Sequence, residues 1–260
     1  MRIGAFVESR FSSRRLPGKN AKPILGQPML SRLLERLKQS RLVDVVCVAT
    51  SDETSDDLIE EIALHSGASC CRGSLDDVLL RVLNAAKSNN VDVIVEITGD
   101  CPLVDAKIVD ATVKRYLKGD FDYVTNILDR LTFPIGFDVQ VFSTKVLEQV
   151  SKLTEDPMDR SNVTSYIYHH SDQFKLLNLF APAKLDRPKY RLCVDYPEDF
   201  SVISQIYESL YPANKYFSCY DIVSFLDDNL ELSRKNTNGE NLFEFPTSNG
   251  RARQEEMDIG

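Results

Sequence analysis

A basic segment near the start of the chain carries the residue types best suited to binding an anion. This basic loop runs from Arg10 to Lys19 (RFSSRRLPGK) and holds four cationic side chains, two serines and a Pro-Gly turn. Cationic side chains this close repel one another unless an anion lies among them. Guanidinium groups hold phosphate oxygens through paired hydrogen bonds, so a polyphosphate suits the loop best. The alternative is a solvated basic loop that binds nothing.

Two aspartates that follow apolar runs have the chemistry of metal ligands. Asp100 stands directly after the run that ends at Gly99, and Asp195 follows the run at 191–194. If both runs are parallel strands, both carboxylates emerge at the edge of the sheet where open α/β sheets bind ligands. Carboxylates facing a polyphosphate bind Mg²⁺ together with the phosphate oxygens. The alternative is that each aspartate caps the helix that follows it.

The elements that must position these residues alternate along the first half of the chain. Apolar runs predict strands at 3–7, 43–49, around 70–71, at 91–98 and at 122–125. Apolar residues at helical spacing predict helices at 29–38, around 58–63, at 76–86 and at 105–117. Strands alternating with helices of this length predict an α/β fold, with a Rossmann-like, mostly parallel sheet and helices on both faces.

The pattern changes after about residue 126. It predicts strands or extended chain at 137–142, 174–180 and 190–194, and helices at 143–153, 161–170, 195–210 and 218–229. We therefore expect a single domain over residues 1–230, with a small α+β portion at about 126–182. Residues 231–260 are polar, and we expect a weakly ordered tail with an aromatic anchor at Phe243 and Phe245.

Composition limits the classes of partner. The 260 residues carry a net charge of −8, which disfavours a nucleic-acid surface and makes the basic loop a local feature suited to a small anion. No apolar run reaches the length of a membrane span, and the start of the chain has no signal-peptide pattern. The six cysteines show no metal-binding spacing, so we expect reduced thiols in a cytoplasmic protein.

Four segments together resemble a known family. They are SRFSSRRLPGK at 9–19, RGSLDDVL at 72–79, TGDCPLVD at 98–105 and VDYPED at 194–199. These segments are similar to those of the sugar cytidylyltransferases, which include CMP-KDO and CMP-sialic acid synthetases. The branch most like this chain is that of spore coat polysaccharide biosynthesis protein F, and the resemblance spans roughly residues 3–210. It implies a fold of the glycosyltransferase-A or nucleotidyltransferase type, with CTP and an acidic sugar as substrates and CMP-sugar and pyrophosphate as products.

The resemblance also implies roles for individual residues. The triphosphate would be held by four residues of the basic loop: Arg10, Ser13, Arg15 and Lys19. Asp100 and Asp195 would hold Mg²⁺, and Lys19, Arg10 and Asp100 would be the catalytic residues. Three further residues match a segment near the nucleotide: Arg72, Asp77 and Arg81. Four more residues are expected on the acceptor side: Asn126, Gly136, Asp138 and Asn162.

The chain departs from the family pattern at several of these positions. Glu8 and Ser9 stand where small or amide residues are usual, and Arg14 stands where a small hydroxyl residue is usual. Asn162 stands where histidine is frequent, which leaves recognition of the sugar open. Nothing in the residues alone selects cytosine over uracil. Relatives are often dimers, so a homodimer is also expected.

Two other functions stay open at the level of sequence. A glycosyltransferase of the same fold usually holds its metal with Asp-x-Asp, and Asp120-Phe-Asp122 is the only convenient match. That motif precedes a strand, which places it at the wrong edge of the sheet. A catalytically silent nucleotide-binding protein is the second alternative, and intact Lys19, Asp100 and Asp195 argue against it.

Overall fold

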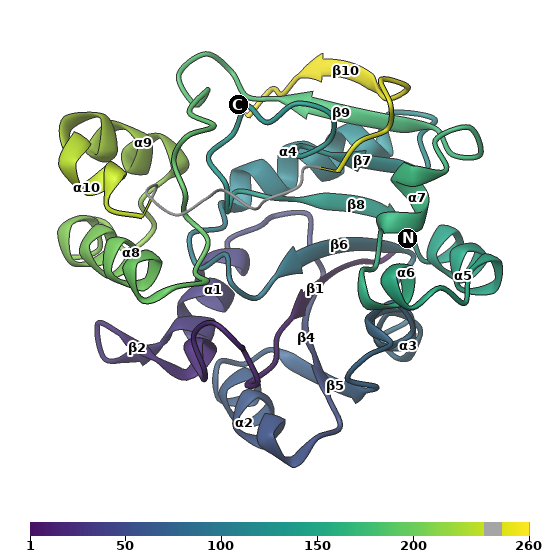
Figure 1. The fold of residues 1–260 in the computed structure, drawn as a ribbon, viewed down its shortest axis with the longest axis horizontal. Coiled ribbons are helices and arrows are strands. Elements are labelled where there is room, and N and C mark those ends of the chain that lie inside the picture. The colour runs from purple at the N-terminus through teal and green to yellow at the C-terminus, as the bar shows by residue number, and fades with distance from the viewer. Residues whose placement is uncertain (237–245, 260) are drawn as a thin grey trace.

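The computed structural model describes residues 1–236 and 246–259, and a mixed sheet lies at its centre (Figure 1). The order of the strands in this sheet is β10-β9-β7-β8-β6-β1-β4-β5. They are β1 (Ile3–Glu8), β4 (Val45–Ser51), β5 (Ser69–Gly73), β6 (Val93–Thr98), β7 (Tyr123–Thr125), β8 (Gln140–Ser143), β9 (Leu176–Phe180) and β10 (Arg253–Glu256). Only β8 runs antiparallel to its neighbours, β6 and β7. The prediction of a mostly parallel α/β sheet is therefore confirmed.

Helices cover both faces of the sheet, because the strands alternate their side chains between two apolar cores. In β1, Ala5 and Val7 belong to one core and Phe6 belongs to the other. The first core is closed by α1 (Met29–Leu37), α2 (Asp57–His65) and α4 (Ala106–Leu117). The second core is closed by α3 (Val78–Ser88), α5 (Thr144–Leu153) and α7 (Ser165–His169). Both faces of the parallel part are therefore buried, as such sheets require.

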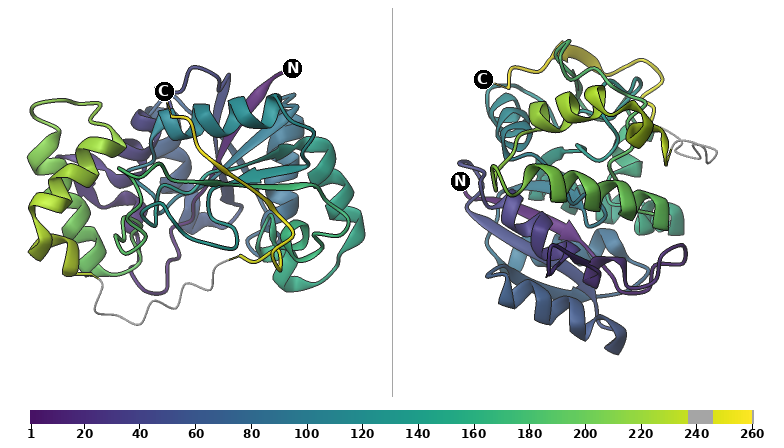
Figure 2. Two further views of the ribbon diagram at one scale, coloured as in Figure 1. Left: turned by 90° about the horizontal axis from the view of Figure 1, so that it is seen from above. Right: turned by 90° about the vertical axis from the view of Figure 1, so that its left-hand side faces the viewer.

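Three helices form a group at one end of the sheet, beside α1 (Figure 2). They are α8 (Pro197–Leu210), α9 (Cys219–Asp228) and α10 (Leu230–Arg234). Pro197 occupies the first turn of α8, and Ser218 caps α9 by accepting a hydrogen bond from the backbone N–H of Asp221. The predicted starts of these two helices are confirmed. The shorter elements are β2 (Pro23–Ile24), β3 (Gln27–Pro28) and two 3₁₀ turns, η1 (Lys19–Ala21) and η2 (Thr54–Asp56).

The single helix predicted at 161–170 is two short helices. The first is α6 (Pro157–Ser161), and the chain is extended at Asn162 before α7 begins at Ser165. The carboxylate of Asp159 accepts hydrogen bonds from the hydroxyls of Thr154 and Ser165. These side-chain bonds hold the break between the two helices in place, since they compete with continuous helical pairing.

The strand predicted at 190–194 was wrong. Only Arg191 forms a ladder bridge, to Ile135, in the part of the chain that the structure describes. Pairing ends there because Gly136 adopts φ +105°, and a Cβ at that position would lie 2.6 Å from the carbonyl carbon of Leu192. The segment nevertheless delivers Asp195 to the expected edge, since the N–H of Val194 donates to the carbonyl oxygen of Asp100 at 2.8 Å.

The C-terminal region differs from the expected weakly ordered tail. Residues 253–256 form β10, which pairs in parallel with β9 at the edge of the sheet. Arg115 of α4 fastens this strand through two hydrogen bonds to Glu255, at 2.6 and 2.8 Å. The expected anchor at Phe243 and Phe245 lies outside the described residues. Among the helices of residues 1–236 and 246–259, none is long and apolar enough to cross a membrane.

Candidate active site

A cleft of about 610 Å³ opens at the carboxyl ends of β1 and β6. The basic loop and the start of α3 form much of its wall. Its lining residues are Glu8, Ser9, Arg10, Ser13, Arg14, Arg15, Lys19, Asn20, Leu75, Asp76, Val78, Arg81, Thr98, Gly99, Asp100, Ser161 and Asp195. Fold and sequence agree on this location, because ligands of open α/β sheets bind beyond the carboxyl ends of the strands.

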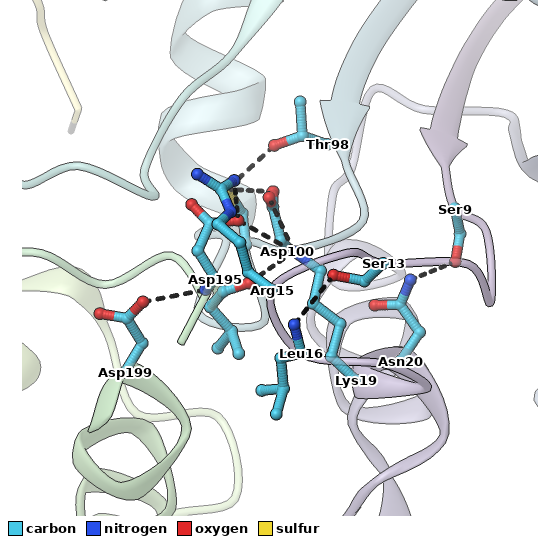
Figure 3. A network of polar contacts seen from close by, with 12 residues as sticks. Ser9, Ser13, Arg15, Leu16, Lys19, Asn20, Thr98, Asp100, Asp195 and Asp199 are labelled. Atoms are coloured by element: carbon cyan, nitrogen blue, oxygen red, sulfur yellow. Dashed lines mark hydrogen bonds and ion pairs between the residues drawn. The ribbon is translucent and has the colours of Figure 1, made fainter. Parts of the chain in front are cut away.

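Lys19 lies at the centre of the charged end of this cleft (Figure 3). Gly18 adopts φ +66°, which lets the chain turn into η1 and directs the Lys19 side chain inward. The ammonium Nζ donates to Asp100 Oδ2 and to Asp195 Oδ1, each at 3.2 Å, and to the carbonyl oxygen of Val194 at 2.5 Å. Burial alone would lower the pKa of Lys19, but the two carboxylates raise it above its ordinary value. Lys19 is therefore a permanent cation, only 8% exposed.

Asp195 is surrounded by three cations, two from the basic loop and one from the segment at 191–194. Besides Lys19, it accepts from Arg15 Nη2 and from Arg191 Nη2, each at 2.6 Å. Burial would raise the pKa of Asp195, yet Lys19 and Arg15 hold it below its ordinary value. Arg191 also donates to Asp199 at 3.1 Å, which ties this carboxylate cluster to the start of α8.

Neither Asp100 nor Asp195 serves as a helix cap. The helix after Asp100 is capped by the side chain of Asp105, and the box that starts α8 uses Tyr196 and Asp199. Both carboxylates are left for the cleft, and they converge on the one ammonium of Lys19. Two carboxylate oxygens around a single cation position, next to a cationic loop, fit a metal ion that takes its other ligands from phosphate and water. Within the described residues, no three His, Cys, Asp or Glu side chains form a complete metal site by themselves.

Polar contacts within the basic loop and from its neighbours fix its backbone. Asn20 Nδ2 donates to Ser9 Oγ at 2.7 Å and, over 3.4 Å, to the carbonyl oxygen of Arg10. The buried carboxylate of Asp56 accepts from the N–H of Phe11 at 2.7 Å. Ser13 Oγ accepts from the N–H of Leu16 at 3.4 Å. The loop is thus pre-shaped, and Arg10, Ser13, Arg14 and Arg15 all line the cleft as a group.

The three residues expected near the nucleotide occupy different places. Arg81 lines the cleft, and its Nη1 donates to the carbonyl oxygen of Ser74 at 2.7 Å. Arg72 lies outside the lining, where it forms ion pairs with Asp57 and Glu60 at 2.6 and 2.9 Å.

Asp77 has structural partners of its own. It caps α3 by accepting from the N–H of Leu80 at 2.9 Å, and it forms an ion pair with Arg160 at 2.5 Å. This pair joins α3 to α6 beside the cleft. Asp77 can therefore act by fixing the position of α6, whose last residue, Ser161, lines the cleft.

None of the four residues expected on the acceptor side is among the described lining residues of the cleft. Asn126 is fully buried, and its amide bridges the carbonyl oxygen of Phe137 and the N–H of Val139. Asp138 is partly buried and accepts from the N–H of Gly136 at 3.3 Å. Burial, with a contribution from the charge of Asp100, raises the pKa of Asp138 to about 7. Asn162 is exposed at the break between α6 and α7.

Sequence reasoning missed two charged residues that the structure brings to the site. Arg191 is the third cation on Asp195, and Glu96 is buried in β6 as a diagonal neighbour of Glu8, which lines the cleft. A charge inside the apolar run 93–98 was a visible signal, since an unpaired buried carboxylate is costly. In the Asp120-Phe-Asp122 motif, by contrast, Asp120 forms a surface ion pair with the side chain of Lys175, and Asp122 accepts a hydrogen bond from the backbone N–H of Lys175.

Similarity to known proteins covers most of the chain. A family model described as cytidylyltransferase matches residues 5–222. An uncharacterized protein of Methanocaldococcus jannaschii is 35% identical over 92% of this chain and 96% of its own length. The spore coat polysaccharide biosynthesis protein SpsF of Bacillus subtilis is 31% identical over 78% of this chain and 85% of its own length.

Solved structures show the same fold. A cytidylyltransferase from Leptospira borgpetersenii matches with a TM-score of 0.84 at 36% identity, over 90% of this chain and 97% of that one. CMP-2-keto-3-deoxy-manno-octonic acid synthetase complexed with CTP matches with a TM-score of 0.63 at 16% identity, over 80% of this chain and 99% of that one. Rv0371C of Mycobacterium tuberculosis, in complex with manganese, matches with a TM-score of 0.56 at 14% identity, over 79% of this chain and 99% of that one. The last two, at such low identity, show a shared fold alone.

Proposed function

The chain belongs to the cytidylyltransferase family, and from that premise we propose that it transfers CMP from CTP to an acidic sugar. Pyrophosphate would be the second product. Nucleotidyl transfer as the class of reaction follows from the family itself. CTP as donor, Mg²⁺ as cofactor, the kind of sugar and the roles of single residues are the finer parts of the proposal.

One observation carries the assignment of the site: Lys19 Nζ lies 3.2 Å from both Asp100 and Asp195, next to a loop of three arginines. An anion-binding loop and a pair of carboxylates are both needed to hold a metal-bound triphosphate. A purely structural ion-pair cluster would not require Arg10, Arg14 and Arg15 to line the same cleft. The combination therefore favours a nucleoside triphosphate as the ligand.

The reaction would be an in-line attack by a sugar hydroxyl on the α-phosphorus, with pyrophosphate as the leaving group. Proteins accelerate such transfers mainly by positioning the reactants and by stabilising the charge that develops. Lys19, Arg10 and Arg15 would neutralise the phosphate oxygens, and Ser13 would add a hydrogen bond. Arg15 and Lys19 engage Asp195 in the structure, so bound triphosphate would compete with that carboxylate for both cations.

Asp100 and Asp195 would hold Mg²⁺ between them. Their oxygens already converge on a cation, the ammonium of Lys19, which supports this part of the proposal. Bound Mg²⁺ supplies Lewis-acid stabilisation of the phosphate oxygens and of the attacking hydroxyl. We assign no side chain as a general base.

The acceptor is proposed as a KDO-like or nonulosonate-like acid, for surface polysaccharide or glycan synthesis. The similarity to SpsF, a spore coat polysaccharide biosynthesis protein, supports the role in polysaccharide synthesis. Asn126, Gly136, Asp138 and Asn162 keep their proposed place on the acceptor side, with Asp138 the one whose charge interacts with Asp100. A cytoplasmic location and a homodimer are further parts of the proposal.

Pyrophosphate release tests the proposal directly. The protein is incubated with CTP, UTP, ATP or GTP, with Mg²⁺ and with a panel of sugar acids. Release with CTP and one acid is the expected result. Turnover of a nucleotide sugar, with no pyrophosphate from any pair of substrates, would replace the proposal with a glycosyltransferase. Omission of the acid and addition of EDTA are the controls, and both should abolish release.

A further inference from the structure

The two carboxylate oxygens of Asp195 have different partners. Oδ1 accepts from Arg15 Nη2 at 2.6 Å and from Lys19 Nζ at 3.2 Å. Oδ2 accepts from Arg191 Nη2 at 2.6 Å. The side chain of Arg15 is 52% exposed, whereas that of Arg191 is 10% exposed. The partners of Oδ1 therefore belong to the basic loop of the cleft, and the partner of Oδ2 belongs to the protein interior.

A buried carboxylate holds the guanidinium of Arg191 in place. Asp199 Oδ1 accepts from Arg191 Nε at 3.1 Å, and Asp199 is almost fully buried. Asp199 Oδ2 accepts from the backbone N–H of Asp195 at 2.9 Å (Figure 3) and from that of Tyr196 at the same distance. One carboxylate thus fixes both the backbone of Asp195 and the cation on its Oδ2. Such an arrangement resists change, because breaking a buried ion pair leaves an uncompensated charge.

Asn236 joins this network from the C-terminal end of α10. Its Nδ2 donates to Asp199 Oδ1 and to the carbonyl oxygen of Arg191, each at 2.9 Å. Asn236 lies beyond residues 5–222, the range that the family model matches. A residue outside the matched range therefore bonds to both residues that orient Asp195.

These contacts decide which oxygen of Asp195 a metal ion can reach. Bound triphosphate would draw Arg15 and Lys19 away from Oδ1, whereas Arg191 keeps its place on Oδ2. A second cation at Oδ2 would be repelled by that guanidinium. Mg²⁺ demands a small, near-octahedral set of oxygens, while the larger Ca²⁺ takes more oxygens and accepts both from one carboxylate. A carboxylate that offers one oxygen therefore favours the smaller ion.

We propose that Arg191, held by Asp199 and Asn236, makes Asp195 a one-oxygen ligand and so selects Mg²⁺ over Ca²⁺. This inference rests on the proposed function, since Asp195 is a proposed ligand of its metal. Arg191 is a positioning residue, because it acts on the metal through Asp195. An ion pair that served stability alone would leave the relative affinity of the two ions unchanged when it is removed.

Binding of CTP with each ion gives the first test. Titration calorimetry measures CTP affinity in excess Mg²⁺ or excess Ca²⁺, with no sugar acid, so that no transfer occurs. Unmodified protein should bind CTP about tenfold more tightly with Mg²⁺, and Arg191→Met should remove most of this preference, as for loss of a residue that orients a metal ligand. Loss of the positive charge strengthens binding of both ions, and the ratio of affinities cancels this common effect. An unchanged ratio in Arg191→Met overturns the inference, as does equal affinity in unmodified protein.

Three further variants separate orientation from stability. Arg191→Lys keeps a cation for Oδ2 and should restore part of the preference. Asn236→Ala should reduce the preference by about threefold, the effect of one hydrogen bond. Arg187→Met, which breaks a half-exposed ion pair with Asp227 in the same region of the chain, is the matched control and should leave the preference unchanged. Urea unfolding shows whether each variant is folded. If Arg191→Met does not fold, the results for Arg191→Lys and Asn236→Ala decide.

Failure of the inference and failure of the proposed function give different results. If CTP binds and the ratio does not depend on Arg191, only the inference falls. If Asp195→Asn leaves CTP affinity in Mg²⁺ unchanged, Asp195 is not a metal ligand, and the inference falls together with that assignment. If CTP binds with neither ion, the proposed function falls as well.

Discussion

Two groups of charged side chains near the cleft differ in how their charges are balanced. Asp100 and Asp195 share the ammonium of Lys19, and Asp195 also accepts hydrogen bonds from Arg15 and Arg191. Glu8 and Glu96 are diagonal neighbours on one face of the sheet, and burial raises the pKa of both. The paired aspartates can therefore stay charged, whereas burial of the two glutamates favours their neutral form.

Loss of a carboxylate that is paired with Lys19 should have the largest effect on turnover. Asp100→Asn removes the charge but keeps the shape, so turnover should fall by about 10³-fold, as for loss of one group that stabilises a transition state. Pyrophosphate release measures turnover, and CTP binding should persist in weakened form. Asp120→Asn, at the surface and paired with Lys175, is the control. Near-normal turnover in Asp100→Asn would remove this residue from the metal site.

Loss of the central cation should come next. Lys19→Met removes the ammonium that both carboxylates share, so turnover should fall about 10²-fold. The same change frees Asp100 and Asp195, so the affinity of nucleotide-free protein for Mn²⁺ should rise, which paramagnetic resonance can measure. Lys175→Met, which breaks an exposed ion pair, should change neither property. A simultaneous loss of turnover and of Mn²⁺ affinity would contradict the idea that Lys19 occupies the cation position.

The buried glutamate in β6 should affect the dependence of stability on pH. Glu96 keeps its proton in the folded protein above its ordinary pKa of 4.5, whereas the unfolded chain loses it. The folded state then binds more protons, so its free energy of unfolding falls as pH rises, by about 1.4 kcal/mol per pH unit. Glu96→Gln should remove this contribution, while Asp138, whose pKa is raised to about 7, keeps its own. Urea unfolding of both proteins at pH 5.5 and 7.5 measures it, and equal slopes would place the proton elsewhere.

Substitution of Arg72 should have the smallest effect on CTP affinity, and it tests whether the nucleotide site reaches this residue. Its guanidinium already donates hydrogen bonds to Asp57, to Glu60 and to the carbonyl oxygen of Ser51. Arg72→Met should therefore lower the free energy of unfolding by about 1 kcal/mol and leave CTP affinity within about threefold. Titration calorimetry measures the CTP affinity, and urea unfolding measures the free energy of unfolding. A loss of CTP affinity of tenfold or more would extend the nucleotide site to Arg72, as the sequence resemblance implies.

Several features were readable from local patterns. Continuous apolar runs predicted the strands of the parallel sheet, and apolar residues at helical spacing predicted most helices, since burial leaves these traces in the sequence. The start of α8 at Pro197 followed from the proline and the acidic residues of its first turn. The strand predicted at 190–194 failed because its partner segment turns at Gly136, which the apolar run itself cannot reveal. The strand β10 was missed because RQEE is polar and is held by Arg115, far away in sequence.

By itself, the sequence determined the residue types of the site and the edge of the sheet where they emerge. The basic loop follows β1 and the aspartates follow two apolar runs, which can be read locally. The parallel direction of the strands then places these residues at one edge of the sheet. Only the tertiary structure decided which charges meet. Lys19 and Asp195 are 176 residues apart, and Glu8 and Glu96 are neighbours only because β1 and β6 pair in the sheet. Contacts of this kind depend on how distant segments pack together. Such packing leaves no periodic pattern in the sequence of either segment.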